Sequence, residues 1–188
     1  REALEMRRRL YAGVDHPDLA ASLNNVGMSL EAMGDRAVGA ALQREALEMR
    51  RRLYAGVDHP DLATSLNNVG MSLEAMGDHA AGEALKREAL EMRRRLFAGV
   101  DHPDVANSLV SVGTSCLADA AFFSAASCFL HDAVEMLMRL FPHRDEPDLA
   151  VALFFLRVFA AGCLRRGTPV CFSRLRRNVL PRRVSALR

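Results

Sequence analysis

The sequence repeats itself, and this repeat constrains the fold more than any other feature. Residues 1–43 and 44–86 are identical at 38 of 43 positions, and a third copy starts at Arg87. The third copy diverges after Leu109 and gains one residue, and a degenerate fourth copy begins at His131. Repeats of this length are typical of solenoids, in which each unit packs only on its neighbours. We therefore expect a stack of units without a single central core.

The repeat divides the chain into an array and a tail. We expect the array to span residues 1–148, in units of about 1–43, 44–86, 87–130 and a partial 131–148. Residues 149–188 are expected to form a degenerate terminal helix and a basic tail. The array carries 16 basic and 23 acidic residues, whereas residues 149–188 carry nine arginines and no acidic residue. This asymmetry of charge indicates two regions that behave differently.

Two helical patterns fill each unit. In the first, apolar residues recur at three- and four-residue steps: Leu19, Leu23, Val26 and Leu30. Gly34 and Asp35 interrupt this pattern, and a second stripe follows at helical spacing: Leu42, Ala46, Met49 and Leu53. Pro60 then fits the first position of the next helix, where no amide hydrogen is needed. The sequence predicts an all-α fold of antiparallel helix hairpins, which must stack to bury both stripes.

Three segments of the repeat resemble a known family. They read S-L-N-N-V-G-M-S-L-E-A-M-G-D from Ser22, then A-L-Q-R-E-A-L-E-M-R, then D-H-P-D-L-A. They resemble tetratricopeptide repeats of the longer kinesin-light-chain type, and the residues on the signature packing positions are Leu23, Gly27, Leu30, Gly34 and Ala46. Gly39 and Gly82 depart from the usual alanine, and Gln43 and Lys86 replace a usual aromatic. The resemblance implies a right-handed α-solenoid, a superhelix with a concave groove.

The resemblance also implies that the first helices of the units line this groove. The residues expected on the groove face are Asn24, Asn25, Met28, Glu31, Asn67, Asn68, Met71, Glu74, Asn107 and Thr114. Asparagine amides both donate and accept hydrogen bonds, so a ladder of them can hold the main chain of an extended peptide. Flexible methionines would add adaptable apolar contacts. The alternative is that the asparagines only bridge adjacent helices.

Arginine triplets recur at the ends of the second helices. After Arg7–Arg9, the triplets are Arg50, Arg51 and Arg52, and then Arg93, Arg94 and Arg95. Stacking of the units would align them in a basic ridge that attracts acidic partners. The competing interpretation is a solvated face, in which the cations complement the helix C-termini and pair with glutamates one turn earlier. We favour the solvated face.

The thrice-repeated D-H-P-D places imidazole and carboxylates close together at Asp15, His16 and Asp18. Each set marks a helix start, so we interpret it as capping and loop packing and predict no metal site. Phosphate-binding, dinucleotide-binding and hydrolase motifs are missing from the sequence. We therefore predict no catalytic residue, no cofactor and no small-molecule substrate.

These features predict a non-catalytic scaffold that binds a protein or peptide in the concave groove. One alternative is self-association, since near-identical units expose matching faces. Another is attachment to an anionic membrane or to nucleic acid through the basic tail. The four cysteines show no paired spacing, which favours a reducing, cytoplasmic compartment.

Overall fold

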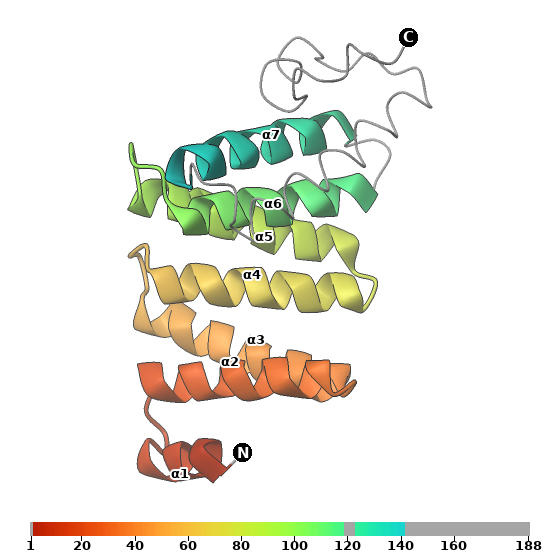
Figure 1. The fold of residues 1–188 in the computed structure, drawn as a ribbon. Coiled ribbons are helices and arrows are strands. Elements are labelled where there is room, and N and C mark those ends of the chain that lie inside the picture. Colours follow the sequence, from red (N-terminus) through yellow and green to blue (C-terminus); the bar gives the residue numbers. More distant parts are fainter. Residues whose placement is uncertain (1, 119–122, 142–188) are drawn as a thin grey trace, which may run out of the picture. The chain divides into compact units, whose positions relative to one another are not determined.

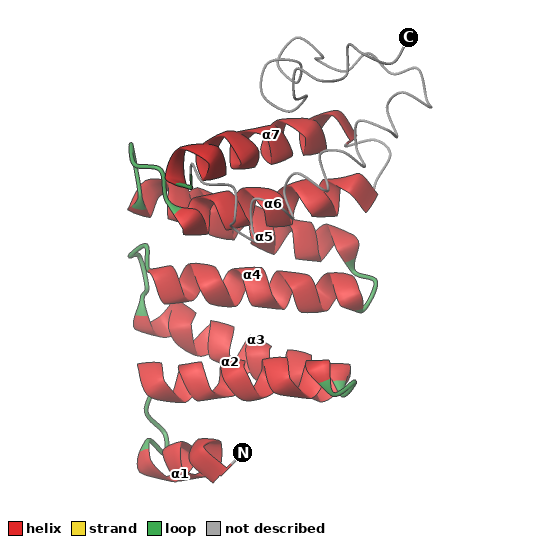
Figure 2. Ribbon diagram, in the orientation of Figure 1, coloured by secondary structure: helices red, strands yellow, loops and turns green. Residues whose placement is uncertain are grey.

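The computed structural model describes residues 2–118 and 123–141, which form seven α-helices and no strand (Figures 1 and 2). The helices are α1 (Glu2–Leu10), α2 (Pro17–Ala32), α3 (Arg36–Leu53), α4 (Pro60–Ala75), α5 (His79–Leu96), α6 (Pro103–Ala118) and α7 (Phe123–Leu140). None of these described helices is both long and apolar enough to cross a membrane. The predicted all-α fold is confirmed.

The chain divides into two compact units, Arg1–Ala98 with α1 to α5, and Gly99–Arg188, of which α6 and α7 are described. In the first unit, α2 packs on α3 and α4 packs on α5 as hairpins, and α3 joins the two hairpins by packing on α4 (Figure 1). In the second unit, α6 packs on α7. The boundary predicted at residue 148, and the helix and tail predicted after it, lie outside the described residues.

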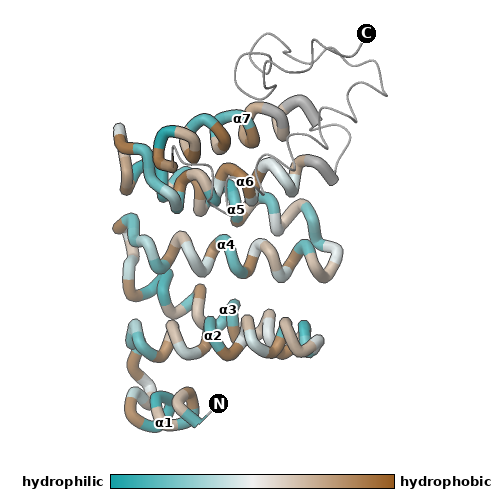
Figure 3. The backbone as a smooth tube through the Cα atoms, viewed as in Figure 1, coloured by the Kyte–Doolittle hydropathy of each residue, from teal (hydrophilic) through white to brown (hydrophobic). Residues whose placement is uncertain are grey.

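Two apolar clusters in the core of the first unit each draw on three helices. The cluster of α1, α2 and α3 contains Leu4, Leu19, Ala20, Leu23, Ala46 and Met49. The cluster of α3, α4 and α5 contains Leu47, Leu62, Ala63, Leu66, Val69, Ala89 and Met92. Helix α3 thus buries Ala46 in the first cluster and Leu47 in the second. Along the helices, apolar segments alternate with polar ones (Figure 3). Burial between neighbouring hairpins stabilises the stack, as the repeat predicted.

Each first helix begins with the same histidine cap. His59 precedes Pro60, which occupies the first helical turn, and His59 Nδ1 accepts a hydrogen bond of 3.1 Å from the amide of Asp61. The His59 ring also stacks on Tyr54, with ring centroids 3.6 Å apart. His16 makes the same two contacts at the start of α2. The predicted capping and loop-packing role of D-H-P-D is confirmed, with histidine as the capping side chain.

Glycines let the two helices of each hairpin cross closely. A Cβ atom added to Gly27 would come within 2.8 Å of the Gly39 carbonyl oxygen, and one added to Gly39 would come within 2.6 Å of the Gly27 carbonyl oxygen. Gly70 and Gly82 repeat this crossing between α4 and α5. The departure from alanine at residues 39 and 82 therefore has a steric reason, because any side chain at this point would push the helices apart.

Candidate functional site

The face formed by α2 and α4 carries most of the residues predicted to line the groove. On α2, the predicted residues Asn24, Met28 and Glu31 lie three or four residues apart and so share one side of the helix, and Asn25 lies one step further round. The large apolar side chains that are exposed within α2 and α4 are Met28, at 50%, and Met71, at 53%. We call this surface the α2–α4 face; it consists of Asn24, Asn25, Met28, Glu31, Asn67, Asn68, Met71, Ser72 and Glu74.

Asparagine side chains join the two helices of this face. Asn68 donates a hydrogen bond of 3.0 Å to Asn24 Oδ1 and lies 3.6 Å from the sulfur of Met28. Asn24 itself is buried. These two residues therefore make the helix-bridging contact that we considered as the alternative to peptide binding, whereas Asn25 is exposed.

Asn67 occupies in α4 the position that Asn24 occupies in α2. Its amide nitrogen lies 3.5 Å from the sulfur of Met71. Its carbonyl oxygen Oδ1 is buried and has no hydrogen-bond partner among the described residues. Asn67 and Met71 thus form a pair of polar and apolar side chains on one helical turn, with the methionine exposed.

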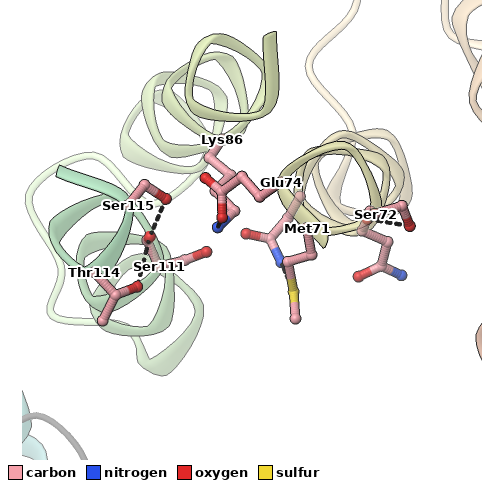
Figure 4. A network of polar contacts seen from close by, with 9 residues as sticks. Met71, Ser72, Glu74, Lys86, Ser111, Thr114 and Ser115 are labelled. Carbon is pink, nitrogen blue, oxygen red and sulfur yellow. Dashed lines mark hydrogen bonds and ion pairs between the residues drawn. The ribbon is translucent and has the colours of Figure 1, made fainter. Parts of the chain in front are cut away.

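A polar network lies beside the asparagines, at the positions where an aromatic residue is usual. Between the hairpins, the Ser72 hydroxyl of α4 hydrogen-bonds to the carboxylate of Glu31 in α2 and lies 2.8 Å from Gln43 Oε1 in α3. In the second hairpin, Lys86 Nζ forms an ion pair of 2.6 Å with Glu74 Oε2. Figure 4 shows Lys86 of α5 and Glu74 of α4 reaching toward each other, with Met71 pointing away from them.

Sequence reasoning did not include Ser72, Gln43 and Lys86 in the site. One signal in the sequence could have pointed to Gln43 and Lys86, because each is a polar residue at a position where an aromatic is usual. In the structure, Gln43 lies opposite Gly27 and Lys86 lies opposite Gly70. The side-chain stems fill the space next to these glycines, since a Cβ added there would come within 2.8 to 2.9 Å of their Cγ atoms. Their polar ends then reach the polar side chains of the neighbouring first helices.

The arginine triplets point in different directions instead of lying in one exposed row. Arg50 is buried and donates hydrogen bonds to the Asp61 carbonyl oxygen, at 2.9 Å, and to the Ser65 hydroxyl, at 2.7 Å. Arg51 forms an ion pair of 3.0 Å with Glu88 of the next second helix. Arg52, Arg94 and Arg95 are exposed and bind Asp15, Glu91 and Asp58, and Arg93 is buried.

Ion pairs also join the ends of each hairpin. We call them the loop–helix pairs, because an aspartate before the first helix binds an arginine at the end of the second: Asp15 with Arg52, Asp58 with Arg95, and Asp101 with Arg139. Each arginine donates two hydrogen bonds, at 2.6 to 2.9 Å, which lower the pKa of its aspartate. The third pair spans 38 residues instead of 37, which places the residue gained by the third copy between Asp101 and Arg139.

The predicted site residues of the second unit lie on α6. Asn107 is exposed. Thr114 is partly buried, and its hydroxyl donates a hydrogen bond of 2.9 Å to the Ser111 carbonyl oxygen, as the Ser115 hydroxyl also does (Figure 4). The Thr114 hydroxyl is thus already engaged by its own helix.

A separate hollow of about 360 Å³ opens in the first unit between α1, α2 and α3. Aliphatic side chains dominate its lining, which consists of Leu4, Glu5, Arg8, Val26, Leu30, Asp35, Val38 and Leu42. None of the residues predicted for the peptide groove lines it. Among its charged lining residues, Arg8 forms an ion pair of 2.9 Å with Glu45.

The family of the chain follows from its sequence profile. The tetratricopeptide repeat profile matches twice, over residues 18–95 and 61–139, which together cover more than half of the chain. The chain belongs to the tetratricopeptide repeat family. Repeats of this family generally serve as scaffolds for protein–protein interaction. No curated protein matches the sequence.

Solved structures with the same fold come from proteins of the kinesin-light-chain type. BtubC (BKLC) from P. vanneervenii superposes with a TM-score of 0.73 at 22% identity, over 100% of this chain and 76% of that one. The nearly identical TPR-like repeats of a kinesin-light-chain-type protein from Podosopora anserina give 0.70 at 16% identity, over 93% and 83%. A single-residue variant of those repeats gives 0.71 at 16%, over 93% and 81%. These similarities confirm the predicted solenoid fold.

Proposed function

We propose that the chain is a non-catalytic scaffold and that its α2–α4 face holds a peptide segment or a helix of a partner protein. The observation that carries this proposal is the exposure of Met28 and Met71 on two first helices whose other large apolar side chains are inside the repeat. Methionine is enriched at protein–protein interfaces relative to the rest of the protein surface.

The chemistry of the face suits an extended peptide or an amphipathic helix. Methionine side chains adapt their shape and so accept varied apolar residues of a partner. The exposed amide of Asn25 supplies donors and an acceptor for a peptide main chain. The buried Oδ1 of Asn67 has no donor within the described residues, so a small rotation of its amide toward a ligand would satisfy it. In the second unit, we propose the exposed Asn107 and the partly buried Thr114 of α6 as further contacts.

We place this function in a reducing, cytoplasmic compartment. Cys116 and Cys128 are both free thiols, and Cys116 is buried. Free thiols persist where glutathione and thioredoxin keep proteins reduced. Neither thiol is needed for the proposed contacts.

The test is capture of partners by the whole chain and by the double variant Asn67→Ala, Met71→Ala, quantified by mass spectrometry. We expect a defined set of proteins to bind the natural chain and to be lost with the double variant, because both contacts of one helical turn are removed. Met76→Ala is the matched control, since Met76 is exposed at the end of α4 outside this stripe. An unchanged set of partners at unchanged helicity by circular dichroism would contradict the proposal.

A further inference from the structure

The two hairpins of the first unit differ in charge at a buried position that lies beside a glutamate. The copies are identical around Glu31 and Glu74, but the second helix places Gln43 beside the first glutamate and Lys86 beside the second. Both residues are almost completely buried, at 1% and 4% exposure. Two nearly identical hairpins thus differ at this point: Glu74 has a buried cation beside it, and Glu31 does not.

The ion pair of the second hairpin neutralises its glutamate. Lys86 Nζ lies 2.6 Å from Glu74 Oε2, and the other carboxylate oxygen of Glu74 is buried. A partner molecule therefore finds no net charge at this point. In such a buried ion pair, the positive charge of the lysine balances the negative charge of the glutamate inside the protein.

The first hairpin leaves its glutamate with a net charge. Glu31 accepts a hydrogen bond from Ser72 and has no basic partner within the described part of the chain. Glu31 is only partly buried. Glu31 also lies one helical turn from the exposed Met28, and the neighbouring Asn68 and Ser72 are uncharged. A carboxylate that is partly desolvated beside apolar groups favours a cation supplied from outside.

We propose that Glu31 is a subsite for a basic side chain of the bound peptide, with Met28 and Met71 receiving an apolar side chain next to it. This inference rests on the proposed function and specifies its partner: a segment with lysine or arginine close to an apolar residue. Met28 and Glu31 are separated by roughly 5 Å along the helix axis. Side chains on one face of an extended peptide repeat at roughly 7 Å, so the basic and apolar residues are expected within about two positions of each other.

The protein itself supplies the matched variants for a test. Gln43→Lys gives Glu31 the internal cation that Glu74 has, in surroundings where the second hairpin already accommodates a lysine. Lys86→Gln changes the same position of the other copy and leaves the charge of Glu31 unmatched. Both variants and the natural chain are used at full length to select from a phage-displayed library of random twelve-residue peptides, and the selected pools are sequenced.

The expected result is enrichment of lysine and arginine near apolar residues in the pools from the natural chain and from Lys86→Gln, and loss of this enrichment with Gln43→Lys. A peptide selected by the natural chain should bind Gln43→Lys about three- to tenfold more weakly by fluorescence anisotropy, and about 1 M NaCl should reduce the difference. Replacing the lysine of this peptide with glutamine should weaken its binding to the natural chain by a similar factor.

A second substitution keeps the test decisive if Gln43→Lys does not fold. Glu31→Gln removes the charge but retains an acceptor for the Ser72 hydroxyl, and it should abolish the basic preference at unchanged helicity. Selection of apolar peptides without a basic preference, sensitive to Met71→Ala, would overturn this inference and leave the proposed function standing. Failure to select any peptide would overturn both, and a basic preference that persists in Gln43→Lys and Glu31→Gln would overturn the assignment to Glu31.

Discussion

At the scale of single residues, Gln43 and Lys86 show how a polar side chain can replace a core aromatic. Burying a polar group is unfavourable unless it keeps a partner, and both residues keep one: Ser72 lies against Gln43, and Glu74 binds Lys86. Their methylene stems fill the space beside the helix crossing. The side chain at this position therefore packs against the glycine through its methylene groups and makes a polar contact through its terminal group.

Removing the buried cation should destabilise the second hairpin. Lys86→Met keeps the stem but leaves Glu74 without its cation, and we expect a loss of about 1 to 3 kcal/mol in the free energy of unfolding. The loss should be smaller than for a fully enclosed pair, because Glu74 retains some exposure. Gln43→Met is the matched control and should cost about 1 kcal/mol, since only an uncharged contact is lost. Urea unfolding measures both; equal losses would contradict this account of the ion pair.

The histidine caps give a second prediction at this scale. His59→Ala should lower stability by about 0.5 to 2 kcal/mol, because the Asp61 amide loses its acceptor and Tyr54 loses its stacking partner. His59→Asp restores an acceptor without an aromatic ring, so it should recover part of the loss. Thermal unfolding followed by circular dichroism measures the difference. If the alanine and aspartate variants melt together, the hydrogen bond contributes nothing.

At the scale of helices, the close crossings determine which substitutions the hairpins accept. Gly70→Leu should overpack the crossing of α4 and α5 and cost about 1 to 3 kcal/mol or more, because even a Cβ would come within 2.8 Å of the Gly82 backbone oxygen. Gly113→Ala is the milder comparison: its Cβ would come within 2.8 Å of the buried Leu130 side chain and not of a backbone oxygen, and alanine favours the helix. Melting temperatures of the two variants and of the natural chain test whether Gly70→Leu is the more destabilising substitution.

The helices and their limits could be predicted from the sequence, whereas most contacts of the site could not. Periodicity and Pro60 mark the helices because these signals are local. The bridge from Asn68 to Asn24 and the direction of Arg50 depend on how one hairpin packs on the next, and no local pattern records that. A buried arginine in particular contradicts its average preference and is explained only by the Ser65 hydroxyl and the Asp61 carbonyl that receive it.

At the scale of the whole molecule, acid should weaken the structure through the loop–helix pairs. An aspartate whose pKa is lower in the folded state stabilises the fold above its unfolded pKa of about 3.9, and this stabilisation is lost as the pH falls through the folded value. We therefore expect the melting temperature to decrease below about pH 4.

The triple variant Asp15→Asn, Asp58→Asn, Asp101→Asn tests this assignment. It should melt at a lower temperature than the natural chain at about pH 7 and should lose less on acidification, because its side chains no longer titrate. Added salt at neutral pH should narrow the gap, since the arginines of these pairs are exposed. Parallel pH curves for both proteins would show that other groups control the acid response.

The fixed spacing of the contacts between hairpins has a consequence for how such a chain can change in evolution. Arg50 reaches Ser65 and Arg51 reaches Glu88 at the same offsets at which Arg7 reaches Ser22 and Arg8 reaches Glu45. An additional copy inserted in frame at the junction of residues 43 and 44 would meet every partner it requires on both flanks. Unequal recombination between the duplicated gene segments can therefore lengthen or shorten the protein by one whole copy without a new contact having to arise by mutation.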